Sequence, residues 1–335
     1  MKKETIKTEN SVGHLLAHDI TRIVQGESKG PLFRKGHRIE PEDVDKLLDV
    51  GKNNIYILTL EEGDVHEDDA GRRLGAAISG PGTYCVEPKE SRVNLFAEYD
   101  GLLRIDTDAV YRINDLEHSL CATIPVNSIV RKDQMVAATK VVPLVVSEED
   151  VAAVEEIGRA GAVVSVRPFR KKKVACVITG SEVYHHRVDD AFAPVIRSKV
   201  SAYGSELSDI AYAPDDSEMI TAAILEAKEK GAELIVVTGG MSVDPDDLTP
   251  GAILATGARL VKQGSPVLPG AMFLVAYLED VPVLGVPAAG MYFKNTMFDR
   301  MLPMVFADVE IQRSDIVAMG VGGLIMNNER YTVEK

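Results

Sequence analysis

Two short segments combine glycine, hydroxyl and carboxylate residues in a way that could bind an anion. The first reads TGGMSVDPDD at 238–247, and the second reads TGSE at 179–182. Glycine lets the backbone approach a ligand closely and adopt positive φ. A Thr-Gly-Gly turn can therefore present N–H groups to a phosphate or carboxylate, while Thr238 and Ser242 add hydroxyl donors.

The carboxylates of the first segment oppose that role unless a cation is present. Asp244, Asp246 and Asp247 crowd into four residues and would repel a bound anion. A Mg²⁺ ion that bridges these acids and the phosphates of a ligand would remove the conflict. The segment predicts a metal–phosphate or metal–oxyanion site, and the alternative is a tight turn whose aspartates cap the next helix.

The second segment repeats this chemistry on a smaller scale. Thr179, Gly180 and Ser181 supply small and hydroxyl residues, and Glu182 supplies a carboxylate. A helix cap is again the alternative reading. Two such turns are harder to dismiss than either one alone, provided that the fold brings them together.

The elements before these turns indicate that it does. Apolar runs at 174–178 and 233–237 predict buried strands, and the segments at 190–203 and 217–230 predict helices. Further strands are expected at 207–212, 272–278 and 281–286, with a last helix through 292–306. Strands alternating with helices predict an α/β fold, with a mostly parallel sheet flanked by helices. Ligands bind such sheets at the carboxyl ends of the strands, where both turns lie.

The N-terminal half has a different pattern. A short helix is expected at 41–50, and short β-like pieces fill 92–142 without a long helical pattern. The acidic stretch at 61–69 predicts a solvated loop, because it lacks ordered metal-ligand spacing. We therefore expect a β-rich accessory region at 1–147, a helical linker at 148–170, the α/β domain at 171–310 and a C-terminal tail at 311–335.

Composition restricts the classes of partner and compartment. The net charge of −14 disfavours a general nucleic-acid or anionic-membrane binder. No apolar run of about 18 residues suggests a membrane span, and the first residues lack the apolar region of a secretory signal. The three cysteines are far apart in sequence, which argues against a disulfide framework or a CxxC metal site. A cytoplasmic protein fits best.

The order of these motifs resembles a known family. ITGSEV, then PDD at 214–216, then VVTGGMSVDPDDLT is similar to the molybdopterin-binding domain of molybdenum-cofactor biosynthesis proteins. That group includes molybdopterin adenylyltransferases, molybdopterin molybdotransferases and a domain shared with competence-damage-type nucleotide hydrolases. The resemblance covers roughly 170–310, and N-terminal segments such as GHLLAHDITRIV also resemble molybdotransferase accessory domains. The chain is most similar to a divergent molybdotransferase.

The resemblance implies roles for individual residues. Thr238, Gly239, Gly240 and Ser242 would hold the terminal phosphate of molybdopterin. The other implied cofactor-binding residues are Thr179, Gly180, Ser181, Met241, Pro269 and Gly270. Glu182, Asp215 and Asp247 would be catalytic, and Glu182, Asp246 and Asp247 would bind Mg²⁺.

The chain also departs from the family pattern. Asp244 stands where the family has a further glycine, two residues after the serine of the motif, and residues 286–290 read VPAAG where molybdotransferases carry LPGNP. The resemblance implies binding of molybdopterin or its adenylylated form and Mg²⁺-assisted molybdate insertion. The alternatives are a non-catalytic pterin carrier or sensor, and a nucleotide pyrophosphate hydrolase. A homodimer is implied, with molybdoenzymes or other cofactor-biosynthesis proteins as partners.

Overall fold

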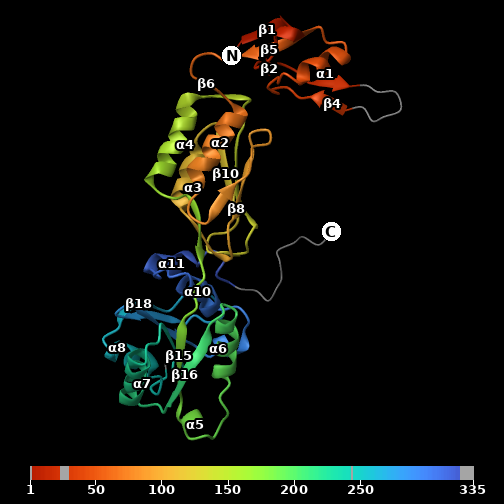
Figure 1. Cartoon of the computed structure of the whole chain (residues 1–335). Helices are drawn as coiled ribbons and strands as arrows, with labels where there is room; N and C mark the ends of the chain where they lie inside the picture. Colours follow the sequence, from red (N-terminus) through yellow and green to blue (C-terminus); the bar gives the residue numbers. More distant parts are fainter. Residues whose placement is uncertain (1, 23–29, 243, 325–335) are drawn as a thin grey trace, which may run out of the picture. The chain divides into compact units, whose positions relative to one another are not determined.

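The chain folds into two compact units. The computed structural model describes residues 2–22, 30–242 and 244–324. The first unit comprises Met1–Tyr99 and Leu103–Val166, and the second comprises Asp100–Leu102 and Arg167–Lys335. Both units are traced in Figure 1. The second unit holds both glycine-containing turns.

A six-stranded sheet forms the centre of the second unit. In spatial order its strands are β16 (Glu206–Ala213), β15 (Lys173–Thr179), β17 (Leu234–Thr238), β20 (Val281–Val286), β19 (Leu274–Leu278) and β18 (Arg259–Gln263). The first four are parallel to one another, and β19 and β18 are added antiparallel. The central strands are near-continuous apolar runs because both of their faces are buried. The predicted α/β fold with a mostly parallel sheet is confirmed.

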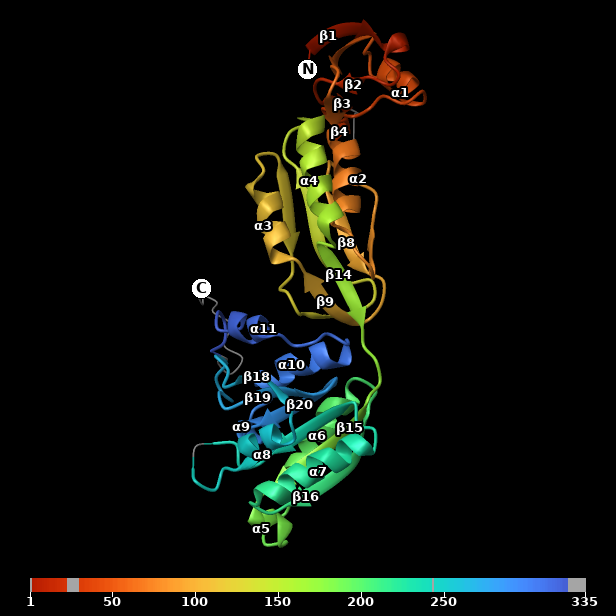
Figure 2. The same cartoon turned by 90° about the vertical axis from the view of Figure 1, so that its left-hand side faces the viewer.

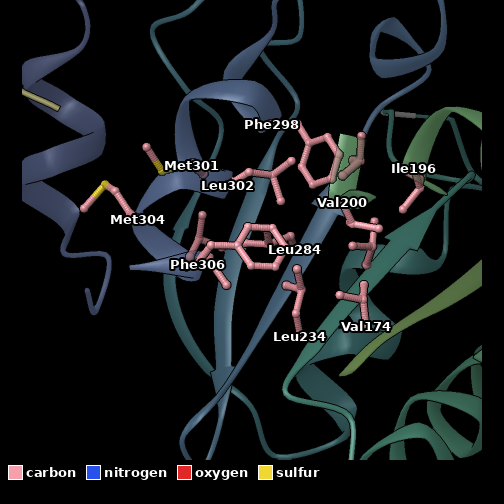
Figure 3. Close-up of a cluster of buried hydrophobic side chains, with 14 of the residues drawn as sticks. Val174, Ile196, Val200, Leu234, Leu284, Phe298, Met301, Leu302, Met304 and Phe306 are labelled. Atoms are coloured by element: carbon pink, nitrogen blue, oxygen red, sulfur yellow. The ribbon is translucent and has the colours of Figure 1, made fainter. Parts of the chain in front are cut away.

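Helices cover both faces of this sheet (Figure 2). Alternate residues of β15 point to opposite sides, so that Val174 and Cys176 pack with α6 (Phe192–Ser201) and α10 (Met297–Phe306). Ala175 and Val177 pack on the other side with α7 (Ser217–Glu229) and α8 (Thr249–Ala255). Figure 3 shows part of the first cluster, which contains Phe298, Met301 and Phe306 of α10 together with Leu284 and Leu234 of the sheet.

Capping residues determine where these helices begin. Asp216 accepts the Met219 N–H at 2.9 Å, so that α7 starts after it, and Gly231 follows its end with φ +84°. The helix predicted at 292–306 is two helices, α9 (Ala289–Tyr292) and α10. A capping box formed by Thr296 and Asp299 restarts the chain as α10. The remaining helices of this unit are α5 (Ser181–Tyr184) and α11 (Arg313–Ala318).

The first unit is rich in β-structure, as predicted. Its strands are β1 (Lys2–Lys7), β2 (Leu15–Leu16), β3 (Ile20–Arg22), β4 (Gly30–Phe33), β5 (Asn54–Thr59), β6 (Asp64–His66), β7 (Thr83–Cys85), β8 (Val93–Ala97), β9 (Gly101–Ile105), β10 (Ser119–Thr123), β11 (Ile129–Val130), β12 (Met135–Val141), β13 (Val145–Ser147) and β14 (Val164–Pro168). The first two residues of β9 and the last two of β14 fall within the second unit. Its helices are the 3-10 turn at Thr8–Asn10, α1 (Asp43–Asp49), α2 (Glu67–Ile78), α3 (Thr107–Asp115) and α4 (Glu148–Ala160). Two hydrophobic clusters, one within residues 1–59 and one from residue 65 onward, form its cores.

Two helices of the first unit correct the sequence-based expectations. The acidic stretch at 61–69 is not a solvated loop, because α2 begins at Glu67 and the buried His66 accepts the Asp68 N–H. Acids in a first helical turn are stabilised by the helix dipole, so the same residues suit a helix start. Likewise, α3 lies within the stretch expected to be mostly β, where Asp106 accepts the Ala109 N–H at 3.0 Å.

The compact units also divide the chain differently from the expected boundaries. Helix α4 lies in the expected linker, yet Val151, Val154 and Ile157 are buried in the core of the first unit. In the expected tail, Ile311 and Ile316 are buried in the core of the second unit. Among the described residues, no helix is both long and apolar enough to cross a bilayer.

Candidate functional site

The two glycine-containing turns leave neighbouring strands at the same edge of the sheet. Ile178 of β15 lies opposite Thr238 of β17, and Thr238 lies opposite Val286 of β20. The strands run parallel, so the segments after residues 179, 238 and 286 all emerge together. The structure therefore brings the two predicted turns side by side at the edge where α/β sheets bind ligands.

The paired glycines are required by the closeness of these turns. Gly239 has φ +89°, and a Cβ on it would lie 2.1 Å from the carbonyl oxygen of Thr179. Gly240 has φ +52°, and a Cβ there would lie 3.0 Å from Oγ1 of Thr249. Any side chain at Gly239 would thus push the two turns apart.

Threonine side chains lie beneath the turns. Oγ1 of Thr179 is 3.0 Å from Oγ1 of Thr249, and the Thr249 N–H donates to the Gly240 carbonyl at 3.3 Å. Thr238 is fully buried, and its Oγ1 has no hydrogen-bond partner among the described residues. Thr249 was not among the predicted site residues. Its position next to Pro250 at the start of α8 marks a helix start, but sequence spacing does not reveal its contact with Thr179.

The glycine turn leaves backbone donors available for a ligand. Within the described segments, the N–H groups of Gly239, Gly240 and Met241 donate no hydrogen bond. The Met241 side chain is buried and packs against Gly285 of β20, where a Cβ would lie 2.6 Å from its Cε. Met241 therefore anchors the turn to the sheet, while Ser242 is exposed. A turn of this kind suits a phosphate or carboxylate group.

The acidic residues near the turns hold local backbone structure. Asp215 accepts the Ser181 N–H at 2.9 Å, and Ser181 Oγ accepts the Asp215 N–H at 3.2 Å. The Glu182 carboxylate folds back over Gly180, 3.0 Å from where a Cβ would lie. Asp247 accepts the Asp244 N–H at 2.8 Å, which closes the loop after the glycine pair.

These carboxylates are not gathered into a metal centre. Within the described ranges, no three His, Cys, Asp or Glu side chains are close enough together to hold a metal ion. Asp246 is exposed, and the structure does not bring Glu182 together with Asp246 and Asp247. The metal-binding and catalytic roles of these residues remain predictions.

Pro269 and Gly270 lie in the loop between β18 and β19, at the same edge of the sheet. A Cβ on Gly270 would lie 3.5 Å from Thr296 and 3.9 Å from Ala289. This loop therefore contacts the segment that follows β20. That segment, rather than the glycine turn itself, lies nearest to the Cβ position of Gly270.

Comparisons with known proteins address the same region. Residues 175–309 match the model of a family described as a probable molybdopterin binding domain, and residues 5–59 match a family described as a domain of unknown function. A CinA-like protein of Mycobacterium avium (strain 104) is 35% identical over 77 residues, which are 23% of this chain and 18% of that relative. The chain thus covers less than a fifth of the length of this curated relative.

Solved structures resemble part of the chain at low sequence identity. The CinA protein of Thermoplasma acidophilum, described as of unknown function, is 16% identical with a TM-score of 0.36, covering 40% of this chain and 98% of that one. The molybdopterin biosynthesis enzyme MoaB of Thermus thermophilus is 18% identical with a TM-score of 0.33, covering 40% of this chain and 89% of that one.

The second unit is thus built on an α/β domain with adjoining glycine turns at the carboxyl edge of its sheet. The part of the chain that carries these turns, residues 175–309, matches the model of the probable molybdopterin binding domain family.

Proposed function

We propose that this protein acts in molybdenum-cofactor biosynthesis and binds molybdopterin, or its adenylylated form, through the terminal phosphate. The observation that carries the proposal is the turn at Gly239 and Gly240. Its two positive-φ glycines lie against Thr179 and leave N–H groups without partners in the described structure. Backbone donors of this kind bind phosphate without needing a basic side chain, which fits a chain of net charge −14.

The loop after the turn supports an anion site in spite of its acids. Asp247 is directed to the Asp244 N–H, so its charge is partly compensated inside its own loop. Asp215 is similarly directed to the Ser181 N–H. Both side chains fix the backbone conformation of the turns, and a phosphate site made of backbone N–H groups requires a fixed backbone.

Insertion of molybdate is the finer part of the proposal. In that reaction Mg²⁺ would neutralise charge on the phosphate and oxyanion, and Glu182, Asp246 and Asp247 are the residues predicted to hold it. These three residues do not form a cluster in the described structure. The residues of this chain bind the phosphate, orient it at the glycine pair and fix the loop around it.

Calorimetric titration with molybdopterin, with and without Mg²⁺, tests the proposal. Mass analysis after adding molybdate then distinguishes insertion from binding. We expect saturable binding with one molybdopterin per chain, and a molybdenum-loaded product would establish an insertase. Binding without conversion would identify a carrier or sensor. No binding under either condition would contradict the proposal.

A second candidate is hydrolysis of a nucleotide pyrophosphate. The curated relative described above is a CinA-like protein, and the sequence resembles the domain of competence-damage-type nucleotide hydrolases. The same glycine turn would then hold the phosphates of the nucleotide. Release of a nucleoside monophosphate from ADP-ribose without any pterin would support this function in place of the first.

A further inference from the structure

We propose that Tyr292, with Phe293 beside it, is a stacking platform for the planar heterocycle of the ligand whose phosphate lies at Gly239 and Gly240. The inference rests on the proposed function and extends it, because it assigns a second subsite. The chemical class of the ligand is a fused-ring heterocycle that carries a phosphate ester, as in a pterin or a purine nucleotide.

Strand order places Tyr292 near the glycine turn. β20 is the parallel neighbour of β17, and Val286 pairs with Thr238. Adjacent strands are about 4.8 Å apart, so the chain leaves β20 immediately beside the first residue of the Thr-Gly-Gly motif. The segment after β20 therefore forms part of the rim around any ligand bound at that motif.

The segment stays close to the sheet edge because it folds at once into a short helix. The Gly290 N–H donates to the Pro287 carbonyl at 2.8 Å, and the Phe293 N–H donates to the Ala289 carbonyl at 3.0 Å. Gly290 is buried, and a Cβ on it would lie 2.6 Å from Val286. Two extended residues span at most about 7 Å, and four helical steps add about 6 Å. Tyr292 thus lies within about 13 Å of the end of β20, a distance that a heterocycle with a phosphate side chain can span.

The ring of Tyr292 is available for stacking. Tyr292 is 76% exposed and Phe293 is 40% exposed. Among the described residues, Tyr292 makes no ring contact and no side-chain hydrogen bond, whereas Tyr84 stacks on Phe96 and Tyr212 donates to Asp190. Covering an exposed aromatic ring with a flat ligand removes apolar surface from water and is therefore favourable.

The residues around the ring favour an anionic heterocycle. Residues 288–290 are Ala-Ala-Gly, and such short side chains leave room over the sheet edge. Lys294 is exposed and has no ion-pair partner in the described parts of the chain. It adds a positive charge two residues after Tyr292 in the sequence, whereas the glycine-containing turns carry mainly acids.

The test separates the ring from the phosphate. Affinities of molybdopterin, AMP and ribose 5-phosphate are measured for the wild type and for Tyr292→Ala, Tyr292→Phe and Tyr111→Ala. Ribose 5-phosphate carries the phosphate ester without a heterocycle, and the molybdopterin and AMP arms distinguish a pterin from a purine. Tyr111 is 72% exposed on α3 in the other unit, so its substitution is a matched control.

We expect Tyr292→Ala to weaken binding of the tighter-binding heterocycle about 5- to 150-fold, the range of one aromatic stack. Ribose 5-phosphate should bind Tyr292→Ala as it binds the wild type, and Tyr292→Phe and Tyr111→Ala should bind all three ligands like the wild type. An equal loss for all three ligands, or none, would overturn the platform. If Gly239→Ala no longer binds the ligands while Tyr292→Ala binds them like the wild type, the result would support the proposed function and contradict the stacking platform. If the wild type binds none of the ligands, both fall.

Discussion

The hydroxyl oxygens of Thr179 and Thr249 lie 3.0 Å apart, although 70 residues separate them in the sequence. Thr179 ends β15 and Thr249 begins α8, so this contact joins the two glycine-containing turns from below. It explains how two loops from different strands can form one site.

Removing the hydroxyl of Thr249 should loosen the site more than the fold. Thr249→Val keeps the shape of the side chain but removes a buried hydrogen bond, which contributes on the order of 1 kcal/mol. We expect molybdopterin affinity to fall about fivefold or more, with Thr249→Ser restoring it. Thr221→Val is the control, because its hydroxyl bonds to Ser217 and Ala252 carbonyls away from the turns. Equal affinities for Thr249→Val and wild type would show that the contact does not shape the site.

Gly239→Ala should abolish binding of molybdopterin while the protein remains folded. Its Cβ would meet the Thr179 carbonyl oxygen, so the turns must separate. Gly231→Ala provides a matched control, because Gly231 has φ +84° but nothing within 4 Å of its Cβ position. Both variants carry backbone strain of about 1–2 kcal/mol at a positive φ, and calorimetry should show loss of binding only in Gly239→Ala. Normal affinity in that variant would place the ligand elsewhere.

Substitutions of Asp247 should separate its structural role from a metal role. Asp247→Asn retains an oxygen that can accept the Asp244 N–H but loses the charge that Mg²⁺ requires. Asp247→Ala loses both. We expect Asp247→Asn to bind molybdopterin without Mg²⁺ as the wild type does and to lose any Mg²⁺-dependent increase. Should Mg²⁺ raise the affinity of Asp247→Asn and wild type equally, Asp247 would not be a metal ligand.

Phe306→Ala should destabilise the second unit strongly. Phe306 is fully buried, and its ring stacks on Tyr203 with centroids 4.3 Å apart. Truncation of a buried phenylalanine typically costs about 3–5 kcal/mol. Denaturant unfolding should show this loss, whereas Tyr111→Ala at an exposed position should change the free energy of unfolding little. A small effect of Phe306→Ala would contradict the core shown in Figure 3.

Thiol labelling should distinguish the three cysteines, which are free in the structure. Burial raises the pKa of Cys121 to about 11 and raises the pKa of Cys176 still further, so neither forms the reactive thiolate near neutral pH. Cys85 is exposed. At mildly alkaline pH we expect one label per native chain by mass spectrometry and three in denaturant. Rapid labelling of Cys176 in the native protein would contradict its place in the sheet.

Much of the second unit follows from local sequence. Continuous apolar runs such as 174–178 indicate buried parallel strands. Asp216 before the first turn of α7 and Gly231 after its last turn mark the two ends of that helix. Because both turns follow such strands, their placement at one edge could be predicted. The restart of the chain at Thr296 is not among the predictions, although Lys294, Asn295 and Thr296 interrupt the apolar pattern between Phe293 and Met297.

The finer structure of the site depends on contacts that are distant in sequence. The pairing of Thr179 with Thr249 requires the order of β15, β17 and α8 in space, which no local pattern contains. The hydrogen bond from the Ser181 N–H to Asp215 could not be predicted for the same reason. A carboxylate near a strand end can equally cap a helix or bind a ligand. In the first unit, the acidic residues in the first turn of α2 were expected in a solvated loop, because a run of charged residues is typical of both a loop and a helix start.

The most direct test of the central claim is amide NMR of protein labelled with ¹⁵N only at glycine, recorded as molybdopterin is added. If the phosphate binds the backbone donors of the turn, the Gly239 and Gly240 amide signals should shift strongly downfield, and the distant Gly231 signal should stay unchanged. Saturable binding that leaves the Gly239 and Gly240 signals in place would contradict the account.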